Sequence, residues 1–424
     1  MWAGPGKYWP RGAVAAQAGK IVYAGAEAEW QTGPGAEVLD VGGGLILPGL
    51  VNAHCHAAMV LFRGLSDDLT LGDWLNKVIF PAEARWVNEE MVELCTLLAA
   101  AEMLLSGTTC VGDAYFCMVG AAKAYARAGL RAMAAQGVID FPAPGMPDPE
   151  KKLEVARNFL EAWQGRDPLV RPALFAHSLT TCGPETLRGV AELAAKYGVY
   201  WYTHLAETRQ EADAVRARFG LSGARHLEGL GVLASLKAAV HGIWLNDEEI
   251  ELLARRGVGL IHCPESNQKL ASGAGEVGRW LAAGIKVGLG TDGAASNNDL
   301  DMIAEVGAAA RLAKVVAGDP AALPAGAALD LALEGSAAAL GLEGAAGRLA
   351  PGYYADIMVL DTKAPHLTPL NEVSSALAYQ ARGGDVRHVV VNGRVVVKDR
   401  KVLSFDLPAV MAKVRKLALK VAKG

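Results

Sequence analysis

Two histidines, His54 and His56, end a short apolar segment that spans residues 47–53. In a β-strand, residues i and i+2 point to the same face, so both imidazoles would be directed at one point. A pair of convergent imidazoles is a common half of a metal site. Because two histidines near a strand end can also be accidental, the pair predicts a metal site only if the chain supplies further ligands.

Further ligands of the right type follow two later apolar segments. His204 ends residues 200–204, and Asp292 comes directly after residues 286–291. Three imidazoles and one carboxylate suit a divalent ion and leave a position open for water, whose pKa the ion lowers toward neutrality. The sequence therefore predicts one divalent ion, Zn2+ in the first place and Fe2+ or Mn2+ as alternatives, held by His54, His56, His204 and Asp292.

Two more side chains stand where they could act on that water. Glu207 lies three residues after His204, and a carboxyl group with a near-neutral pKa is a good proton carrier. His241 ends residues 238–241 and could donate a hydrogen bond to the attacking hydroxide or to the developing oxyanion. No lysine ends the third or fourth predicted strand, where a carboxylated lysine would bridge two ions, so a single ion is favoured. The His-x-Glu and Pro-Cys-x-x-Cys signature of cysteine-ligated deaminases is absent.

Eight apolar segments are predicted to be the strands that position these residues. Helical patterns separate most of them, which predicts a parallel sheet covered on its outer face. Eight strand–helix units match an α/β fold of the (β/α)8 TIM-barrel type, whose active site lies at the C-terminal ends of the strands. An open doubly wound sheet is the alternative, but no Gly-rich phosphate loop follows an early strand. The predicted strands are residues 45–52, 108–113, 131–139, 173–177, 200–204, 238–241, 259–262 and 286–291.

The two ends of the chain have a different pattern. Residues 1–46 contain short β-like runs and many glycines, and residues 388–397 read as a hairpin around an Asn392-Gly393 turn. We expect a small β-sandwich built from residues 1–46 and 356–424, with the barrel formed by residues 47–355. Residues 408–423 are predicted to form a basic amphipathic helix.

Composition limits the classes of function. The chain has 424 residues, 52% of them hydrophobic and 20% charged, and a formal net charge of −4. These values are typical of a globular enzyme and give no sign of nucleic acid or membrane as a partner. No signal-like start or long uncharged apolar run is present, which predicts a cytoplasmic protein. The six cysteines lack metal-site spacing and are expected to be reduced.

The motifs described above resemble those of the amidohydrolase superfamily. Within it, four further segments are similar to the 5′-methylthioadenosine/S-adenosylhomocysteine deaminases, namely residues 61–69, 80–83, 263–270 and 290–298. The resemblance covers nearly the whole chain. It implies a metal-dependent barrel with a β-sandwich that converts an adenosine-type nucleoside to the inosine product and ammonia. It also implies a homo-oligomer, a dimer or a tetramer.

The resemblance assigns roles to individual residues. Besides the four metal ligands, it implies that Glu207 moves protons to the ring nitrogen and the leaving amine. His241 would position the hydroxide, and Asp292 would also accept its proton. Glu83 would accept hydrogen bonds from the ribose hydroxyls, and His177 would contact the purine. Without the resemblance, Glu83 would be interpreted as a solvated carboxylate.

One position departs from the pattern. The resembled enzymes that accept S-adenosylhomocysteine hold its amino-acid carboxylate with arginines after the third strand, where this chain has Gln136. Lys151 and Lys152 lie nearby, but lysine is a point charge rather than a bidentate fork. Methylthioadenosine, adenosine or another amino-heterocycle such as guanine, an oxidised purine or a triazine stay open as substrates. A non-catalytic barrel is the alternative from another class.

Overall fold

The largest sheet of the molecule contains eight parallel strands, seen in a computed structural model that describes residues 1–4 and 6–423. Each strand pairs with the next one along the chain, so the order in the sheet runs from β13 back to β6. A single parallel bridge between Cys55 and Asp292 joins the first strand to the end of the last. The predicted (β/α)8 barrel is therefore confirmed. Its strands are β6 (Leu50–Cys55), β7 (Thr108–Tyr115), β8 (Arg131–Val138), β9 (Val170–Ser178), β10 (Trp201–Leu205), β11 (Ala238–His241), β12 (Gly259–His262) and β13 (Val287–Leu289).

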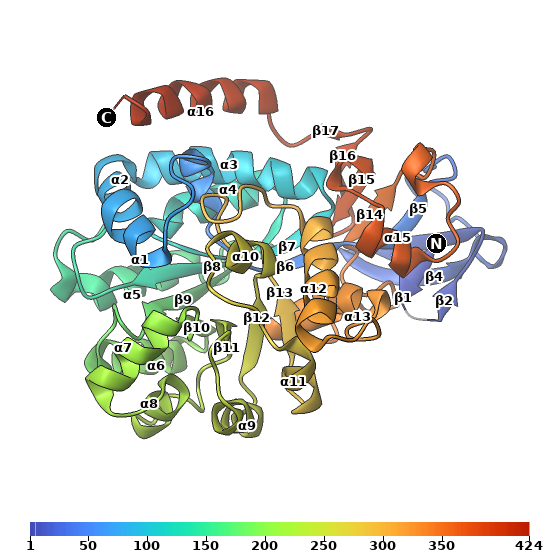
Figure 1. The fold of residues 1–424 in the computed structure, drawn as a ribbon. Coiled ribbons are helices and arrows are strands. Elements are labelled where there is room, and N and C mark those ends of the chain that lie inside the picture. Colours follow the sequence, from blue (N-terminus) through green and yellow to red (C-terminus); the bar gives the residue numbers. More distant parts are fainter. Residues whose placement is uncertain (5, 424) are drawn as a thin grey trace.

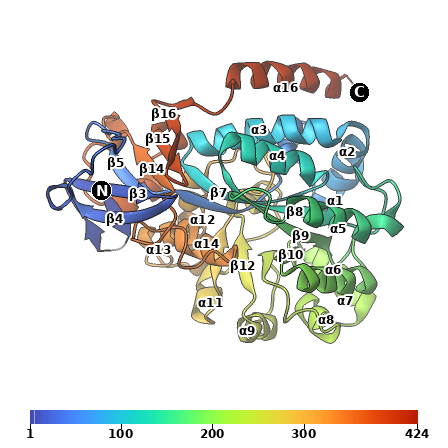
Figure 2. The ribbon, with the colours of Figure 1, turned by 180° about the vertical axis from the view of Figure 1, so that it is seen from behind.

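Helices cover the outer face of this sheet (Figures 1 and 2). Local sequence sets where they begin and end, as in α9, where Asn246 and Glu249 form a reciprocal capping box and Gly257 ends the helix at φ +69°. The helices of the barrel are α3 (Glu89–Leu105), α4 (Met118–Ala128), α5 (Lys152–Trp163), α6 (Pro184–Tyr197), α7 (Arg209–Phe219), α8 (Gly223–Gly229), α9 (Asp247–Arg256), α10 (Pro264–Lys269), α11 (Val277–Ala282), α12 (Met302–Ala317), α13 (Ala325–Asp330) and α14 (Ser336–Ala339). None of the helices in the described part of the chain combines the length and the hydrophobicity needed to cross a bilayer.

The segment between β6 and α3 differs from the other connections because it builds a wall over the strand ends. A short helix, α1 (Leu71–Trp74), begins at Thr70, whose side chain accepts a hydrogen bond from the Asp73 amide. One π-helical turn (Leu75–Ile79) then leads into α2 (Phe80–Trp86). A π-helical turn shifts the side chains by one position and is often found at functional sites.

The predicted strand 45–52 is wrong, because the structure contains two strands there. β5 (Leu45–Pro48) and β6 are separated by Gly49, and β5 pairs antiparallel with β14 (Ile357–Leu360) instead of joining the barrel. A Cβ atom at Gly49 would lie 2.2 Å from the Thr109 side chain, so only glycine fits where the chain changes sheets. The boundary predicted between residues 46 and 47 falls inside β5.

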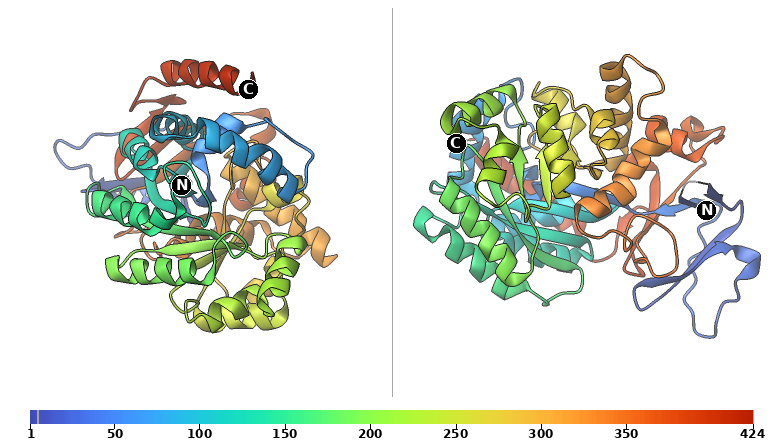
Figure 3. Two further views of the ribbon diagram at one scale, coloured as in Figure 1. Left: turned by 90° about the vertical axis from the view of Figure 1, so that its left-hand side faces the viewer. Right: turned by 90° about the horizontal axis from the view of Figure 1, so that it is seen from below.

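The smaller β-structure lies at one end of the molecule and combines the two ends of the chain (Figures 1 and 3). One sheet has the order β17, β16, β15, β14, β5, and the hairpins β1–β2 and β3–β4 accompany it. Ile21, Ala355 and Ile357 are among the residues that form their shared buried core. The remaining elements are β1 (Trp2–Gly4), β2 (Lys7–Tyr8), β3 (Gly12–Gln17), β4 (Lys20–Ala26), β15 (Val386–Val391), β16 (Arg394–Lys398), β17 (Lys401–Val402), α15 (Val373–Tyr379) and α16 (Leu407–Val421).

Two predictions made from the end segments are confirmed. Asn392 and Gly393 both have positive φ and form the two-residue turn between β15 and β16. The expected C-terminal helix is α16, which buries Val410, Val414 and Val421 and runs beside α3 (Figure 1). The residue limits of the barrel and the sandwich stay a prediction.

A buried ion pair joins the barrel to the sandwich. The Arg131 guanidinium of β8 donates to Asp356 across 2.8 Å (Nε to Oδ2), and both side chains are almost fully buried. The Tyr354 ring packs against two cations, with Lys20 Nζ 3.5 Å and Arg131 Cζ 3.6 Å from its centroid. The ion pair and the cation–π contacts therefore hold three parts of the chain together, namely β4 with Lys20, β8 with Arg131 and the segment of Tyr354 and Asp356.

Replacing Asp356 with Asn should destabilise the protein strongly, because it leaves the Arg131 charge buried without its counter-ion. We expect a loss of about 3–5 kcal/mol in the free energy of unfolding, measured by chemical denaturation. The matched control is Glu27→Gln, which breaks the exposed pair with Arg11 and should cost less than about 1 kcal/mol. Equal losses of unfolding free energy in the two variants would show that the buried Arg131–Asp356 pair stabilises the protein no more than an exposed pair.

Candidate active site

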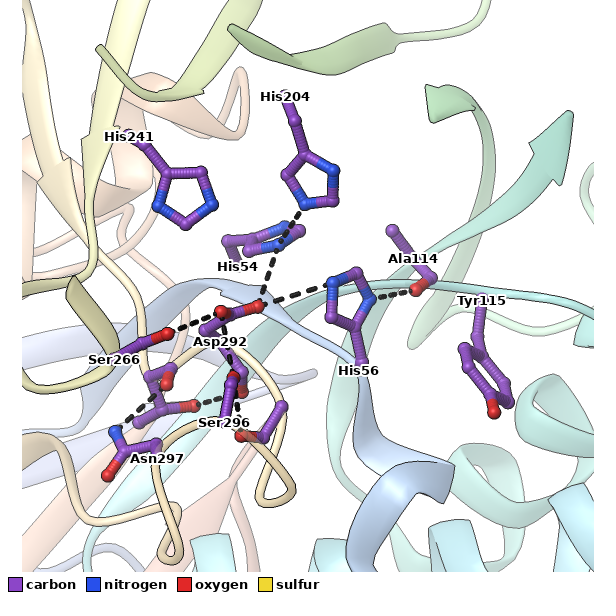
Figure 4. Close-up of polar contacts among 12 residues, drawn as sticks. His54, His56, Ala114, Tyr115, His204, His241, Ser266, Asp292, Ser296 and Asn297 are labelled. Carbon is purple, nitrogen blue, oxygen red and sulfur yellow. Dashed lines mark hydrogen bonds and ion pairs between the residues drawn. The ribbon is translucent and has the colours of Figure 1, made fainter. Parts of the chain in front are cut away.

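Four side chains with metal-binding atoms meet at the C-terminal ends of the barrel strands (Figure 4). His54 is the second-last residue of β6, and His56 comes directly after that strand. His204 lies on β10, and Asp292 lies shortly after the end of β13. Each offers one ligand atom, and these four atoms lie within 4.8 Å of one another. His54 Nε2 is 3.2 Å from His204 Nε2, and Asp292 Oδ1 is 3.2 Å from His56 Nε2. The structure thus brings together the four residues predicted from the sequence.

The state of these side chains fits a bound divalent ion. His56 Nδ1 donates to the Ala114 carbonyl oxygen across 2.5 Å, which leaves the lone pair on Nε2 facing the other ligands. Burial lowers the pKa of His54 to about 3, and burial also holds the pKa of His204 well below its usual value. Both imidazoles are therefore neutral, as metal ligands must be. Nitrogen and oxygen donors in this ratio suit zinc.

Asp292 is held in place by both its oxygens and its backbone. Ser266 and Ser296 donate to Oδ2 across 2.7 and 2.9 Å, which leaves Oδ1 directed at the histidines. Burial alone would raise the pKa of Asp292, but its polar contacts with His54 and His56 outweigh burial and keep the pKa well below the usual value. Its φ of +59° is strained for a residue with a side chain, as is often found at functional sites.

The predicted proton carrier lies beside this centre. Glu207 follows β10 and is 6% exposed, with Oε2 3.6 Å from His241 Nε2. Burial, together with the charges of Asp292 and Glu211, raises the pKa of Glu207 well above the usual value. Glu207 can therefore hold a proton at neutral pH, as a general acid must.

His241, the neighbour of Glu207, ends β11 in a left-handed conformation with φ +73°. Burial lowers its pKa to about 4, so its imidazole is neutral at physiological pH. A neutral imidazole presents one N–H donor and one lone pair, and its hydrogen-bond partners determine which nitrogen carries the proton.

A pocket opens over these residues, and its mostly apolar lining with a few polar groups is typical of small-molecule sites. Its polar lining contains Glu83, His177 and Glu207 in addition to three of the four metal ligands, His56, His204 and Asp292. The rest of the lining is mostly apolar and comes largely from the segment α1–α2. Its apolar and aromatic side chains include Met59, Leu71, Trp74, Leu75, Ile79, Phe80, Phe116, Phe175 and Leu270.

Glu83 is a buried pocket residue, so its interpretation as a solvated carboxylate is wrong. It is 4% exposed and accepts a hydrogen bond from the Tyr115 hydroxyl across 2.7 Å. Burial raises the pKa of Glu83 to about 7. His177 also lines the pocket, and its Nδ1 contacts the Thr181 hydroxyl across 2.9 Å.

Gln136, where the resemblance expects an arginine, does not reach the pocket. Its Oε1 accepts from the Met118 amide at the start of α4, and its Nε2 donates to the Gly137 carbonyl. No lysine or arginine lines the pocket within the described residues. Apart from its histidines, the pocket lining is therefore apolar, acidic or polar without charge.

Some residues around the site were not singled out from the sequence. Ser266 and Asn267 belong to the segment 263–270, which the resemblance marked as a motif without giving these residues a role. Ser296 stands four residues after Asp292, a spacing that could have suggested a contact. Asn52 donates to the Thr291 hydroxyl across 2.7 Å and links β6 to the end of β13, a contact between residues 239 positions apart.

A family model described as the amidohydrolase family matches residues 45–396. The chain belongs to the amidohydrolase family. Proteins named 5-methylthioadenosine/S-adenosylhomocysteine deaminase are similar over almost the full length. One from Syntrophobacter fumaroxidans is 43% identical and covers 97% of this chain and 94% of its own. One from Moorella thermoacetica is also 43% identical and covers 96% and 94%.

Solved structures of other hydrolases have the same fold as this chain. An adenosine deaminase from Xanthomonas campestris with bound zinc has a TM-score of 0.93 and 37% identity, and covers 97% of this chain and 94% of its own. A guanine deaminase from C. acetobutylicum, with a TM-score of 0.82 and 22% identity over 91% of this chain and 94% of its own, shares the fold.

The serine contacts to Asp292 predict an effect on metal affinity. Replacing Ser266 with Ala removes one hydrogen bond that orients the carboxylate, and we expect about 10- to 100-fold weaker zinc binding. Competition with a chromogenic chelator measures the affinity. Ser375→Ala, a change far from the site on α15, is the control and should leave the affinity unchanged. Unchanged affinity in Ser266→Ala would mean that the serine does not orient Asp292.

Proposed function

We propose that this amidohydrolase removes the exocyclic amine of adenosine-type nucleosides by hydrolysis, giving the inosine product and ammonia. Its substrates are 5′-methylthioadenosine, S-adenosylhomocysteine or adenosine, and its cofactor is one divalent ion, Zn2+ in the first place. The observation that carries the proposal is a buried, proton-holding Glu207 beside a three-histidine, one-aspartate centre in a largely apolar pocket. The deaminase names of the relatives support it.

The bound ion supplies one kind of chemistry, which is the lowering of the pKa of a water molecule so that it can attack the ring carbon. The attacking oxygen must lose a proton, and Asp292 is the ionised carboxylate placed to accept it. The ring nitrogen next to that carbon must gain a proton, which protonated Glu207 donates. A further proton moved through Glu207 lets the amine leave as ammonia. His241 stabilises the attacking oxygen by a hydrogen bond.

Substrate binding follows from the polar and the apolar lining of the pocket. Glu83, whose pKa is raised to about 7 by burial, accepts hydrogen bonds from the ribose hydroxyls. His177 contacts the purine, and the apolar lining that includes Trp74 packs against the sugar substituent. An amino-acid carboxylate on that substituent would meet no cation in this lining, and burying an unpaired charge is costly.

Replacing Glu207 with Gln tests the proton carrier. The variant keeps its size and hydrogen-bonding atoms but cannot donate an acidic proton, so we expect kcat to fall about 10²- to 10⁴-fold. Metal content, measured by elemental analysis, should stay at one ion per chain. Glu248→Gln, an exposed change on α9, serves as the control. Near-normal turnover by a metal-loaded Glu207→Gln protein would overturn the assignment.

An ammonia-release screen tests the function itself. We expect turnover of methylthioadenosine and adenosine, with kcat/KM for S-adenosylhomocysteine at least about tenfold lower, equivalent to about 1.4 kcal/mol. Guanine and cytosine should release no ammonia, and a chelator should abolish all activity. Release from a free base alone would favour the alternative of another amino-heterocycle, such as guanine, an oxidised purine or a triazine.

The variant Glu83→Gln sharpens that comparison. It weakens contacts that only a ribose can make, so KM should rise for a nucleoside and stay unchanged for a free base. A metal-loaded protein that turns over no aminated purine and still assembles would favour the non-catalytic barrel.

Two finer properties are proposed on the resemblance and on composition. We propose a homo-oligomer, either a dimer or a tetramer, which light scattering distinguishes. We also propose a cytoplasmic location, which fractionation of the source cells checks.

A further inference from the structure

A buried amide contacts the side of His241 that faces away from Glu207. Asn267 lies on α10 and is fully buried, and its Nδ2 is 3.1 Å from His241 Nδ1. Its backbone is fixed on both sides, because its N–H donates to the Cys263 carbonyl and its carbonyl accepts from the Ser272 amide. The short helix therefore holds this amide against the imidazole.

The contact is the sole side-chain hydrogen bond that Asn267 makes within the described residues. Its Oδ1 is buried and has no hydrogen-bond partner there. A buried amide that satisfies only one end costs free energy, so an apolar side chain of similar size would be cheaper at this position. The packing of the core therefore gives no reason for an asparagine here, whereas the imidazole does.

The direction of the hydrogen bond determines the tautomer of His241. An amide N–H can only donate, so Nδ1 must present its lone pair. The ring proton then lies on Nε2, which faces the Glu207 carboxyl at 3.6 Å and the pocket. The donor at Nδ1 thus leaves Nε2 as the protonated nitrogen on the side of the ring that faces the pocket.

We propose that Asn267 is a positioning residue that fixes His241 as the Nε2–H tautomer, so that His241 acts only as a hydrogen-bond donor to the attacking oxygen. With its proton on Nε2, neutral His241 cannot also accept a proton from the nucleophile at that atom. Proton acceptance belongs to Asp292 and Glu207. The inference rests on the proposed deaminase function for its kinetic consequence, whereas the tautomer itself can be read without any turnover.

Nitrogen NMR of the zinc-loaded protein labelled with 15N in histidine reads the tautomer directly. The His241 signals are identified by their loss in His241→Gln. We expect a protonated Nε2 and a bare Nδ1 in the wild type, and a protonated Nδ1 in Asn267→Asp, whose carboxylate only accepts. A wild-type His241 with its proton on Nδ1 overturns the proposal, whether or not the protein deaminates nucleosides.

Kinetic measurements then test whether Asn267 positions His241 or only supports the fold. In Asn267→Asp we expect kcat to fall about 10²-fold in alkaline buffer, where the neutral ring keeps its proton on Nδ1, with KM little changed. Gln268→Glu adds the same charge at the exposed neighbouring position of α10 and should change kcat less than about twofold.

The background His241→Gln provides a double-mutant cycle. Its amide keeps an N–H near the position of Nε2 but has no tautomer, so adding Asn267→Asp should change kcat less than about threefold. An equal loss in both backgrounds would show that Asn267 acts on the fold and not through His241, and would overturn the proposal. Failure of the deaminase function would appear instead as no ammonia from any variant.

Discussion

The closure of the barrel between β6 and β13 is the constraint on which the active site depends. His54 and His56 come from the first strand and Asp292 from the end of the last, so their ligand atoms meet only if those two strands are neighbours. The join is made by few bonds: the Asp292 amide donates to the His54 carbonyl, and Asn52 contacts both the backbone and the side chain of Thr291. Three of the four metal ligands thus lie on or directly beside the residues that close the sheet. A bound ion would therefore also reinforce the weakest seam of the barrel.

The buried site sets the protonation states that the chemistry needs. Desolvation acts in opposite directions on the two types of group, because it raises the pKa of Glu207 and lowers those of His241 and His54. One apolar enclosure therefore gives a protonated acid next to neutral imidazoles. The pKa of Asp292 stays low despite burial because its polar contacts with two histidines favour the ionised carboxylate. Acid, ligands and base are thus distinguished by their contacts, although all are buried.

Much of this arrangement could be predicted from local sequence. The alternation of apolar runs with helices predicted the barrel, and polar residues at the ends of those runs predicted the four ligands. The break at Gly49 could not be predicted, because it depends on the Thr109 side chain of a neighbouring strand. The same holds for Gln136, which stands where the resemblance expects an arginine and whose side chain accepts from the Met118 amide at the start of α4. The roles of Ser266 and Asn267 also depend on side chains about 26 residues away, whose distance in space the sequence does not state.

The pairing of β5 with β14 has a consequence for the synthesis of the protein. β5 lies immediately before the first barrel strand, and its partner is separated from it by about 300 residues. Throughout translation, β5 must stay on the nascent chain with an unpaired edge and with apolar side chains that later enter the core. The cation–π contacts of Tyr354 with Lys20 and Arg131 can likewise form only after most of the chain has been synthesised. The smaller sheet can therefore be completed only after β14 has been synthesised, and until then the edge of β5 is free to pair with other strands.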